Sequence, residues 1–366
     1  MKVKISDLGN IITGNTPSKK IAEYYDSNDI CFVKPDSLSD KIITILRDTS
    51  EYISENARAK ARIVEKDAVL VTCIGSIGKI GLTVKGEYAF NQQINAILPN
   101  NKILPKYLAY NLLFNKNRII DLANAPVVPI INKTQFGDFE IKIETDTRIQ
   151  DKIVQKLDKV LQIINQRQQE LDKLDELVKA RFVEMFGDVT KNEKKWNSSK
   201  LSELCSLKSG GTPTRQHPEY FEGTIPWITT VSLGKFELTF DDATEYITEE
   251  AIYNSATKII PANSLLFGIR VGVGKVSKNL VPMCTNQDIM AITEINENNI
   301  NLLFLKSILD AFSSFFNSQK RGATIQGIKS ETLKSIDIVI PPIELQNQFA
   351  TFVKQIDKSK LIIKYI

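Results

Sequence analysis

Residues 147–188, TRIQDKIVQKLDKVLQIINQRQQELDKLDELVKARFVEMFGD, carry a regular apolar pattern that decides how the chain is organised. Apolar residues recur there at steps of four and three, with Gln168 as the one polar interruption: Ile149, Ile153, Leu157, Val160, Ile164, Leu171, Leu174, Val178, Phe182 and Met185. This spacing predicts a heptad helix that ends at Gly187 and Asp188 and is roughly 55–60 Å long. An amphipathic helix packed only on its own domain is the alternative, which the length of the pattern disfavours.

The beginning of this helix has a counterpart near the end of the chain. The segment IQDKIVQKL from Ile149 parallels LQNQFATFV from Leu345, 196 positions later. The same offset relates the Thr-Pro pairs of GNTPS (14–18) and GGTPT (210–214). Offsets within two positions of this value relate EYIS to EYIT, NQQ (91–93) to NQD (286–288), and FEIKI to IDIVI. The chain is therefore one unit duplicated nearly end to end.

Each copy begins with about 140 residues of short strand patterns separated by Gly, Asn and Pro turns. Examples are AVLVTCI and INAILP in the first copy, and SLLFGI and DIMAIT in the second. Short helical patterns, LPKYLAYNLLFN and NLLFLKSILDAFSSFFN, lie between the strands. The predicted fold class is therefore α+β, with two similar domains and long helices.

Composition restricts the class of protein. With 366 residues, 42% hydrophobic and 25% charged, the chain suggests two to three globular domains. The N-terminus MKVKISDLGN has no apolar signal segment, and no run of about 18 apolar residues occurs, so we expect no membrane span and a cytoplasmic location. The net charge of +4 permits an acidic partner such as DNA.

The residues of common catalytic and metal sites are scarce. The four cysteines are far apart and form no CxxC pair, so we expect reduced, buried thiols rather than a zinc site or disulfides. The single histidine, His217, lies in the loop sequence TRQHPEYF, where we expect a surface role. One histidine leaves little room for a catalytic triad or a histidine-based metal centre. We expect no cofactor and no metal.

Two glycine-rich segments, CIGSIGKIG (73–81) and GIRVGVGKVS (268–277), occupy matching places in the two copies. Neither fits a Walker A loop, because Ile80 and Val276 follow the Gly-Lys pairs where Ser or Thr would hold Mg²⁺. A plain glycine hairpin is one interpretation. The other is a nucleic-acid contact, in which the backbone approaches a surface closely and a basic side chain reaches a phosphate or a base edge. The duplication and the nearby cations favour the second interpretation.

The layout of GNTPS/GGTPT, IPWIT, EYIS/EYIT, GSIGKIG/GVGKVS, NQQ/NQD, IPPIELQNQFATFVKQID and LDKLDELVKARFVEMFGD resembles the specificity subunits of type I restriction-modification systems over essentially the whole chain. The resemblance implies two target-recognition domains separated by an antiparallel pair of long coiled-coil helices. Each domain would read one half of a split, asymmetric sequence in double-stranded DNA. The chain itself would be non-catalytic. Methyltransferase subunits docked on the helices, and through them restriction subunits, would supply adenine methylation and cleavage.

In this arrangement we expect four parts: a first target-recognition domain at residues 1–145, a long spacer helix at 146–187, a second target-recognition domain at 188–342, and a distal spacer helix at 343–366. The distal helix is shorter than the resemblance implies, so we expect that this chain or its natural gene is truncated. Part of the apolar strip on the first helix would then have no partner helix. We expect that part to form an interface with a methyltransferase subunit or with a second copy of the chain. Its residues are Leu171, Leu174, Val178, Phe182 and Met185.

The resemblance also implies a set of DNA-contacting residues. In the first domain they are Thr16, Ser18, Lys34, Ser76, Lys79, Gln92, Asn132 and Lys133, and in the second Thr212, Thr214, Arg215, Thr229, Arg270, Lys275, Asn286, Gln287, Arg321, Thr324, Gln326 and Lys329. Arg270 and Arg321 are the strongest candidates for base contact, since a guanidinium binds guanine O6 and N7 bidentately. We expect Trp227 and Phe32 to be core residues rather than stacking platforms.

Two other classes of function stay open. One is an interaction or decoy protein that binds methyltransferase subunits through its helices without reading DNA. The polar and basic loop residues argue against it. The other is an enzyme acting at the glycine segments, which the single histidine and the absence of a methyltransferase tetrapeptide disfavour.

Overall fold

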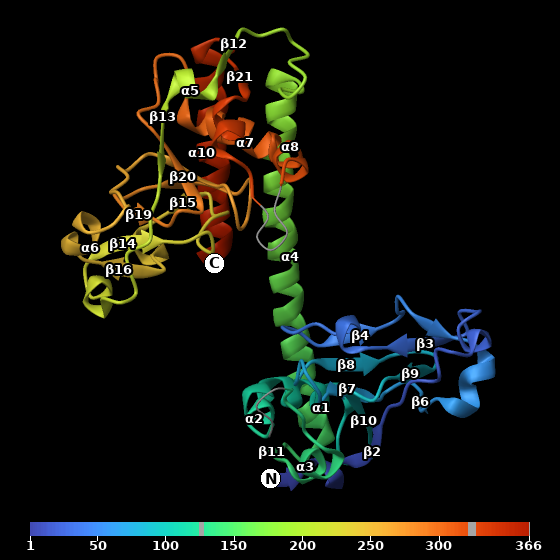
Figure 1. Ribbon diagram of the computed structural model, residues 1–366. Coiled ribbons are helices and arrows are strands. Elements are labelled where there is room, and N and C mark those ends of the chain that lie inside the picture. The colour runs from blue at the N-terminus through green and yellow to red at the C-terminus, as the bar shows by residue number, and fades with distance from the viewer. Residues whose placement is uncertain (124–127, 321–326, 366) are drawn as a thin grey trace. The chain divides into compact units, whose positions relative to one another are not determined.

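The computed structural model describes residues 1–123, 128–320 and 327–365. The chain forms two compact units, Met1–Asn165 (unit 1) and Gln166–Ile366 (unit 2), and helix α4 (Thr147–Phe186) contributes residues to both (Figure 1). Strands and helices are mixed within each unit, so the predicted α+β class is confirmed. The heptad pattern forms one helix of 40 residues. It ends before Gly187, whose φ of 75° is the left-handed conformation typical of a residue that follows a helix.

The main sheet of unit 1 has five strands in the order β2-β10-β7-β8-β4. Its neighbours pair antiparallel except β4 and β8, which are parallel. Val69 and Val71 pack in one core cluster and Leu70 in another, so the period-two alternation of β7 buries both faces of the sheet. The strands are β2 (Gly9–Thr13), β4 (Thr44–Leu46), β7 (Val69–Thr72), β8 (Ile80–Thr83) and β10 (Ile94–Pro99).

A second sheet and three helices complete unit 1, together with the first half of α4. The second sheet, in the order β5-β3-β9-β6, consists of β3 (Ile30–Val33), β5 (Tyr52–Ile53), β6 (Ile63–Val64) and β9 (Tyr88–Phe90). The short strands β1 (Lys2–Lys4) and β11 (Glu140–Lys142) pair with each other. The helices are α1 (Pro105–Phe114), α2 (Lys116–Ile120) and α3 (Lys133–Asp138).

Unit 2 repeats this plan. Its main sheet, in the order β13-β20-β17-β18-β15, consists of β13 (Ser206–Ser209), β15 (Glu237–Leu238), β17 (Leu265–Gly268), β18 (Val276–Asn279) and β20 (Ile289–Thr293). The smaller sheets are β16-β14-β19, made of β14 (Ile225–Ile228), β16 (Glu245–Ile247) and β19 (Cys284–Thr285), and the pair β12 (Ser198–Lys200) and β21 (Asp337–Val339). The helices are α5 (Leu201–Leu204), α6 (Glu249–Tyr253), α7 (Leu302–Ala311), α8 (Ser313–Ser318), α9 (Ser330–Lys334) and α10 (Ile343–Tyr365).

Two buried glutamines show how closely the duplication extends to side-chain contacts. Gln150 near the start of α4 and Gln346 near the start of α10 are both fully buried. The Oε1 atom of Gln150 accepts a hydrogen bond from the N–H of Leu104 at 2.8 Å, and that of Gln346 from the N–H of Asn301 at 2.8 Å. The amide groups of both glutamines donate to two backbone carbonyls each. Each glutamine thus ties the start of its helix to the segment before α1 or α7.

The second half of α4 packs inside unit 2, which corrects one expectation. Phe182 and Met185 were expected to face solvent or a partner, but they are 5% and 9% exposed. The ring of Phe182 lies 5.7 Å from that of Phe304 on α7 and 5.3 Å from that of Phe349 on α10. The apolar seam is therefore covered here by the chain's own helices. A heptad pattern indicates which face of a helix is buried, but it does not identify the residues that cover that face.

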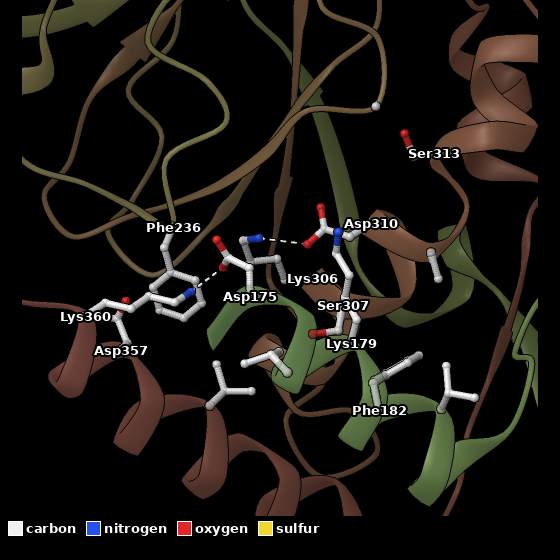
Figure 2. A pocket seen from close by; sticks show the side chains of 15 residues that line it. Asp175, Lys179, Phe182, Phe236, Lys306, Ser307, Asp310, Ser313, Asp357 and Lys360 are labelled. Carbon is white, nitrogen blue, oxygen red and sulfur yellow. Dashed lines mark hydrogen bonds and ion pairs between the residues drawn. The ribbon is translucent and has the colours of Figure 1, made fainter. Parts of the chain in front are cut away.

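A cavity of about 550 Å³ opens beside this packing (Figure 2). Val178 and Phe182 line it from α4, and Val353 from α10. Asp175 on α4 and Lys360 on α10 form an ion pair at its edge, so α4 and α10 also meet at their polar margins. Leu171, Leu174 and Val178, the other members of the expected interface, are half-buried.

The two long helices differ in length. Helix α10 has 23 residues and helix α4 has 40. Among the residues that the structure describes, no helix is both long and apolar enough to cross a membrane.

Candidate nucleic-acid interface

The two glycine segments form the same hairpin in both units. One joins β7 to β8, and the other joins β17 to β18. The N–H of Gly78 donates to the carbonyl of Thr72 at 3.0 Å, and the N–H of Gly274 donates to the carbonyl of Gly268 at 3.1 Å. Gly78 and Gly274 have φ values of 81° and 86°, a region in which any Cβ is strained. The glycines are therefore required by the hairpin itself.

Each hairpin is fastened to two neighbouring segments by backbone bonds that repeat between the units. The N–H of Cys73 donates to the carbonyl of Gln93 at 2.7 Å, and the N–H of Ile269 donates to the carbonyl of Asp288 at 2.9 Å. The carbonyls of Cys73 and Ile269 in turn accept bonds of 2.9 and 2.8 Å from the segments that precede α3 and α9. The hairpin, the NQQ or NQD turn and the segment before α3 or α9 thus lie together in each unit.

The threonines of GNTPS and GGTPT join the same loop cluster. The hydroxyl of Thr16 donates to Oε1 of Gln92 at 2.8 Å, and the hydroxyl of Thr212 donates to Oε1 of Gln287 at 2.5 Å. All four residues belong to the set expected to contact DNA. Four segments therefore meet in each unit, and a Thr-Gln hydrogen bond joins the Thr-Pro loop to the turn in both.

Two basic candidates of unit 1, Lys34 and Lys79, are engaged within the protein, whereas Lys133 is exposed. Lys34 forms an ion pair with Glu51. The ammonium of Lys79 donates to the carbonyl of Pro35 at 3.0 Å, and the side chain is half-buried. This bond uses one of the three N–H donors of the ammonium and holds the side chain toward Pro35. Lys275, its equivalent in unit 2, is exposed.

The arginines of unit 2 differ in how firmly they are held. Arg215 donates two bonds to the carboxylate of Glu245, at 2.7 and 2.5 Å, and its guanidinium lies 4.0 Å from the centre of the Phe221 ring. Arg270 makes one longer contact, 3.3 Å from Nη1 to Oδ1 of Asp288, and its side chain is 51% exposed. Arg270 therefore keeps more of its five donors available to a ligand.

The remaining candidates are in varied surroundings. Asn132 caps α3 by accepting a bond from the N–H of Gln135 at 2.9 Å, and Thr229 lies with its hydroxyl 3.3 Å from that of Thr244. Asn286, also expected to contact DNA, is 8% exposed. Its amide donates to the Asp288 carboxylate because the NQD turn folds back on itself. Exposed candidates are Ser18, Ser76, Lys133, Thr214, Lys275 and Lys329, whereas Arg321, Thr324 and Gln326 lie outside the described residues.

The aromatic and cysteine expectations concern the core. Trp227 and Phe32 are 2% and 1% exposed, so both are core residues as predicted, and the Trp227 indole donates to the Gly211 carbonyl at 3.1 Å. All four cysteines are free, two of them buried and two half-buried. Burial raises the pKa of the Cys73 thiol to about 12, so it stays protonated and unreactive near neutral pH. His217 is exposed, as predicted, and its Nδ1 lies 2.8 Å from Glu219.

Sequence reasoning named Arg270 but missed three other side chains of the loop cluster, Ile74, Gln93 and Asp288. Ile74 and Arg270 are at equivalent hairpin positions, directly after the anchored residues Cys73 and Ile269. Gln93 and Asp288 are the third residues of the NQQ and NQD turns. The repeat alignment already showed that these turns differ only at that residue, which was the available signal. Two valines are also strongly exposed in unit 2 loops, Val231 at 84% and Val271 at 54%.

The comparisons with known proteins agree with the duplicated fold. The chain matches the family model of the type I restriction modification DNA specificity domain twice, at residues 1–173 and 193–365. It is 29% identical to the type I restriction enzyme MjaIX specificity subunit of Methanocaldococcus jannaschii over 184 residues, which is 50% of this chain and 43% of that protein. It is 32% identical to the EcoR124I/EcoR124II specificity subunit of Escherichia coli over 172 residues, 45% of this chain and 41% of that protein. Each match thus spans less than half of the curated relative.

A solved structure shows the same fold. The S subunit of the type I restriction-modification system of M. genitalium aligns with a TM-score of 0.56 at 16% identity, covering 100% of this chain and 91% of that one. The two family matches coincide with the two repeats seen in the sequence and with the two copies of the hairpin cluster. The chain therefore belongs to the family of the type I restriction modification DNA specificity domain.

Proposed function

We propose that this chain is the sequence-specific DNA-binding subunit of a type I restriction-modification complex and that it reads an asymmetric, bipartite target in double-stranded DNA. The observation that carries the proposal is the duplicated loop cluster. Both units hold a glycine hairpin, an Asn-Gln turn and a Thr-Pro loop in the same hydrogen-bonded arrangement. The exposed side chains on that common scaffold differ between the units. Two units with the same loop arrangement but different exposed side chains are suited to bind two half-sites of different sequence.

The proposed contacts divide into two kinds. Ser18, Lys133, Lys275 and Lys329 are exposed polar or basic residues suited to phosphate contacts, which position a protein on DNA without reading its sequence. Arg270 is suited to reading a base edge, because its guanidinium is exposed and, among the described residues, is held by Asp288 alone. Thr16, Thr212 and their glutamine partners would hold the loops in register.

Members of this family are generally non-catalytic specificity subunits. We propose that methyltransferase subunits, and through them restriction subunits, supply adenine methylation and cleavage. This function would place the chain in the cytoplasm with the DNA.

The docking surface for the methyltransferase subunits is proposed on apolar side chains of α4 that remain exposed. Leu177 and Val183, both in unit 2, are 46% and 57% exposed. In the proposed docking surface these exposed residues take the place of Phe182 and Met185, which are buried against other helices of the same chain. Leu171, Leu174 and Val178 stay in the proposed surface as half-buried neighbours. Self-association through the same strip is the competing use.

A selection from a randomised DNA duplex library tests the DNA-binding proposal. The full chain should enrich one consensus made of two unlike half-sites, whose centres are about one helical turn (~10 bp) apart. A decoy protein that only binds methyltransferase subunits would enrich no sequence. A continuous palindromic consensus would also contradict the proposal, because unlike units cannot read two identical halves.

A further inference from the structure

The two units differ chemically at one pair of equivalent positions beside the hairpin. The first member of the pair directly follows the anchored residue and is Ile74 in unit 1 and Arg270 in unit 2. The second member is the residue whose carbonyl anchors the hairpin, Gln93 in unit 1 and Asp288 in unit 2. The backbone hydrogen bonds that anchor the two pairs are equivalent, although the next residue is Gly75 with a φ of 74° in unit 1 and Val271 in unit 2.

In unit 2 the pair consists of the Arg270 guanidinium and the Asp288 carboxylate that positions it. Asp288 is 19% exposed and is held from one side by the amide of Asn286, 3.2 Å from Oδ2. Its other oxygen accepts from Arg270 at 3.3 Å. This contact engages one of the five N–H groups of Arg270, the described residues supply no further partner, and the side chain is 51% exposed. Such a guanidinium matches the two acceptors of guanine, O6 and N7.

In unit 1 the equivalent pair is an apolar side chain and an amide. Gln93 is held by Asn91, whose amide donates to Oε1 of Gln93 at 2.8 Å, as Asn286 holds Asp288. Ile74 is half-buried and forms a backbone bridge with Ile130, which is 41% exposed. A glutamine amide matches the donor and acceptor of adenine, N6 and N7, and an aliphatic side chain fits the methyl group of thymine.

We infer that these two position pairs set which base pair each unit prefers: Ile74 with Gln93 selects an A·T pair in one half-site, and Arg270 with Asp288 selects a G·C pair in the other. The inference rests on the proposed function, in which both units bind DNA. Arg270, Gln93 and Ile74 are the contacting residues. Asp288 is a positioning residue that acts through Arg270.

Exchanging the pairs tests the inference directly. The full chain, the variant Ile74→Arg/Gln93→Asp and the reciprocal variant Arg270→Ile/Asp288→Gln are each used to select from the same randomised duplex library. The first variant should change one A·T pair to G·C in one half-site and leave the other half-site as in the wild type. The reciprocal variant should change one G·C pair to A·T in the opposite half-site. Each variant is the matched control for the other, because each alters a single unit.

A second measurement uses the wild-type chain and is independent of how the variants fold. In the selected duplex, 7-deazaguanine at the Arg270-dependent position removes the N7 acceptor and should weaken binding about tenfold. Deoxyuridine in place of thymidine at the Ile74-dependent position removes one methyl group and should weaken binding about fourfold. If the variants fail to fold, substituting each G and each T of the consensus in turn identifies the sensitive positions.

The outcomes separate the inference from the function on which it rests. If the wild-type chain enriches no consensus, the proposed function fails. If a consensus appears but folded variants enrich it unchanged, or if both half-sites change together, the inference is overturned while the function stands. The inference is equally overturned if no 7-deazaguanine or deoxyuridine substitution in the wild-type site alters affinity.

Discussion

At the scale of the residue, the same amino acid at equivalent positions of the two repeats can have different roles. Lys79 and Lys275 are equivalent in sequence, yet Lys79 is bonded to the Pro35 carbonyl while Lys275 is exposed. A lysine that supplies a hydrogen bond to the protein holds the hairpin to the loop after β3. An exposed lysine at the same hairpin position is available to a phosphate. The two residues therefore form a matched pair for testing.

We expect Lys275→Ala to reduce the slope of log K against log salt by about 1, because one released counterion is lost with each phosphate contact. We expect Lys79→Ala to change this slope less, since its ammonium is already bonded at 3.0 Å. Binding to one duplex is measured by fluorescence anisotropy over a series of salt concentrations. Equal slopes for Lys275→Ala and the wild type would contradict a phosphate contact at Lys275.

At the scale of the element, buried polar contacts join each long helix to its unit. Gln346 bonds three backbone groups near the start of α10, and Gln150 does the same near the start of α4. Both glutamine side chains are fully buried, so an alanine at either position removes three hydrogen bonds that the fold has enclosed.

Gln346→Ala should therefore lower the free energy of unfolding of unit 2 by at least ~1–3 kcal/mol. Gln155 on α4, whose side chain is exposed and bonded to Asp151 one turn earlier, is the matched control. Gln155→Ala should change stability by less than about 0.5 kcal/mol. Urea unfolding followed by circular dichroism measures both, and similar midpoints for the two variants would show that the Gln346 contacts contribute little.

The two faces of α4 in unit 2 permit a second test at this scale. Phe182 packs among the rings of Phe186, Phe304 and Phe349, whereas the next residue, Val183, is 57% exposed. Phe182→Ala should destabilise unit 2 by ~3–5 kcal/mol through the cavity that it leaves. Val183→Ala should be near neutral in stability and, under the proposed docking surface, should weaken binding to a methyltransferase subunit. Thermal unfolding and a pull-down separate the two effects, and a stable Phe182→Ala chain would refute the packing role.

At the scale of the whole molecule, the proposed function makes this chain the DNA-reading subunit and assigns the chemistry to other subunits. We therefore expect the purified chain alone neither to methylate nor to cleave DNA. Adding methyltransferase subunits should restore methyl transfer at the bipartite site. Transfer of labelled methyl groups from S-adenosylmethionine to DNA is the measurement, with a chain-free reaction as control. Methyl transfer by the chain alone would overturn the assignment as a specificity subunit.

The sequence by itself determined the duplication, the α+β class, the long helix and the core positions of Trp227 and Phe32. These features depend on periodicity and on local residue chemistry, both of which can be read from the order of residues alone. A heptad repeat forms a helix whatever it packs against. An indole at the start of a strand is buried in most surroundings. The Gly-Lys loops were also identified as possible hairpins, because tight turns need backbone positions with positive φ and glycine is favoured at such positions.

Only the tertiary structure decided which partner each surface meets. The heptad seam did not reveal that Phe182 packs on Phe304 and Phe349, because these residues are more than one hundred positions away. The identity of a lysine did not reveal that Lys79 bonds a carbonyl 44 positions earlier. The pairing of Arg270 with Asp288 likewise arises from two loops brought together by β17 and β20. Long-range contacts depend on the path of the whole chain, and a local pattern does not contain that path.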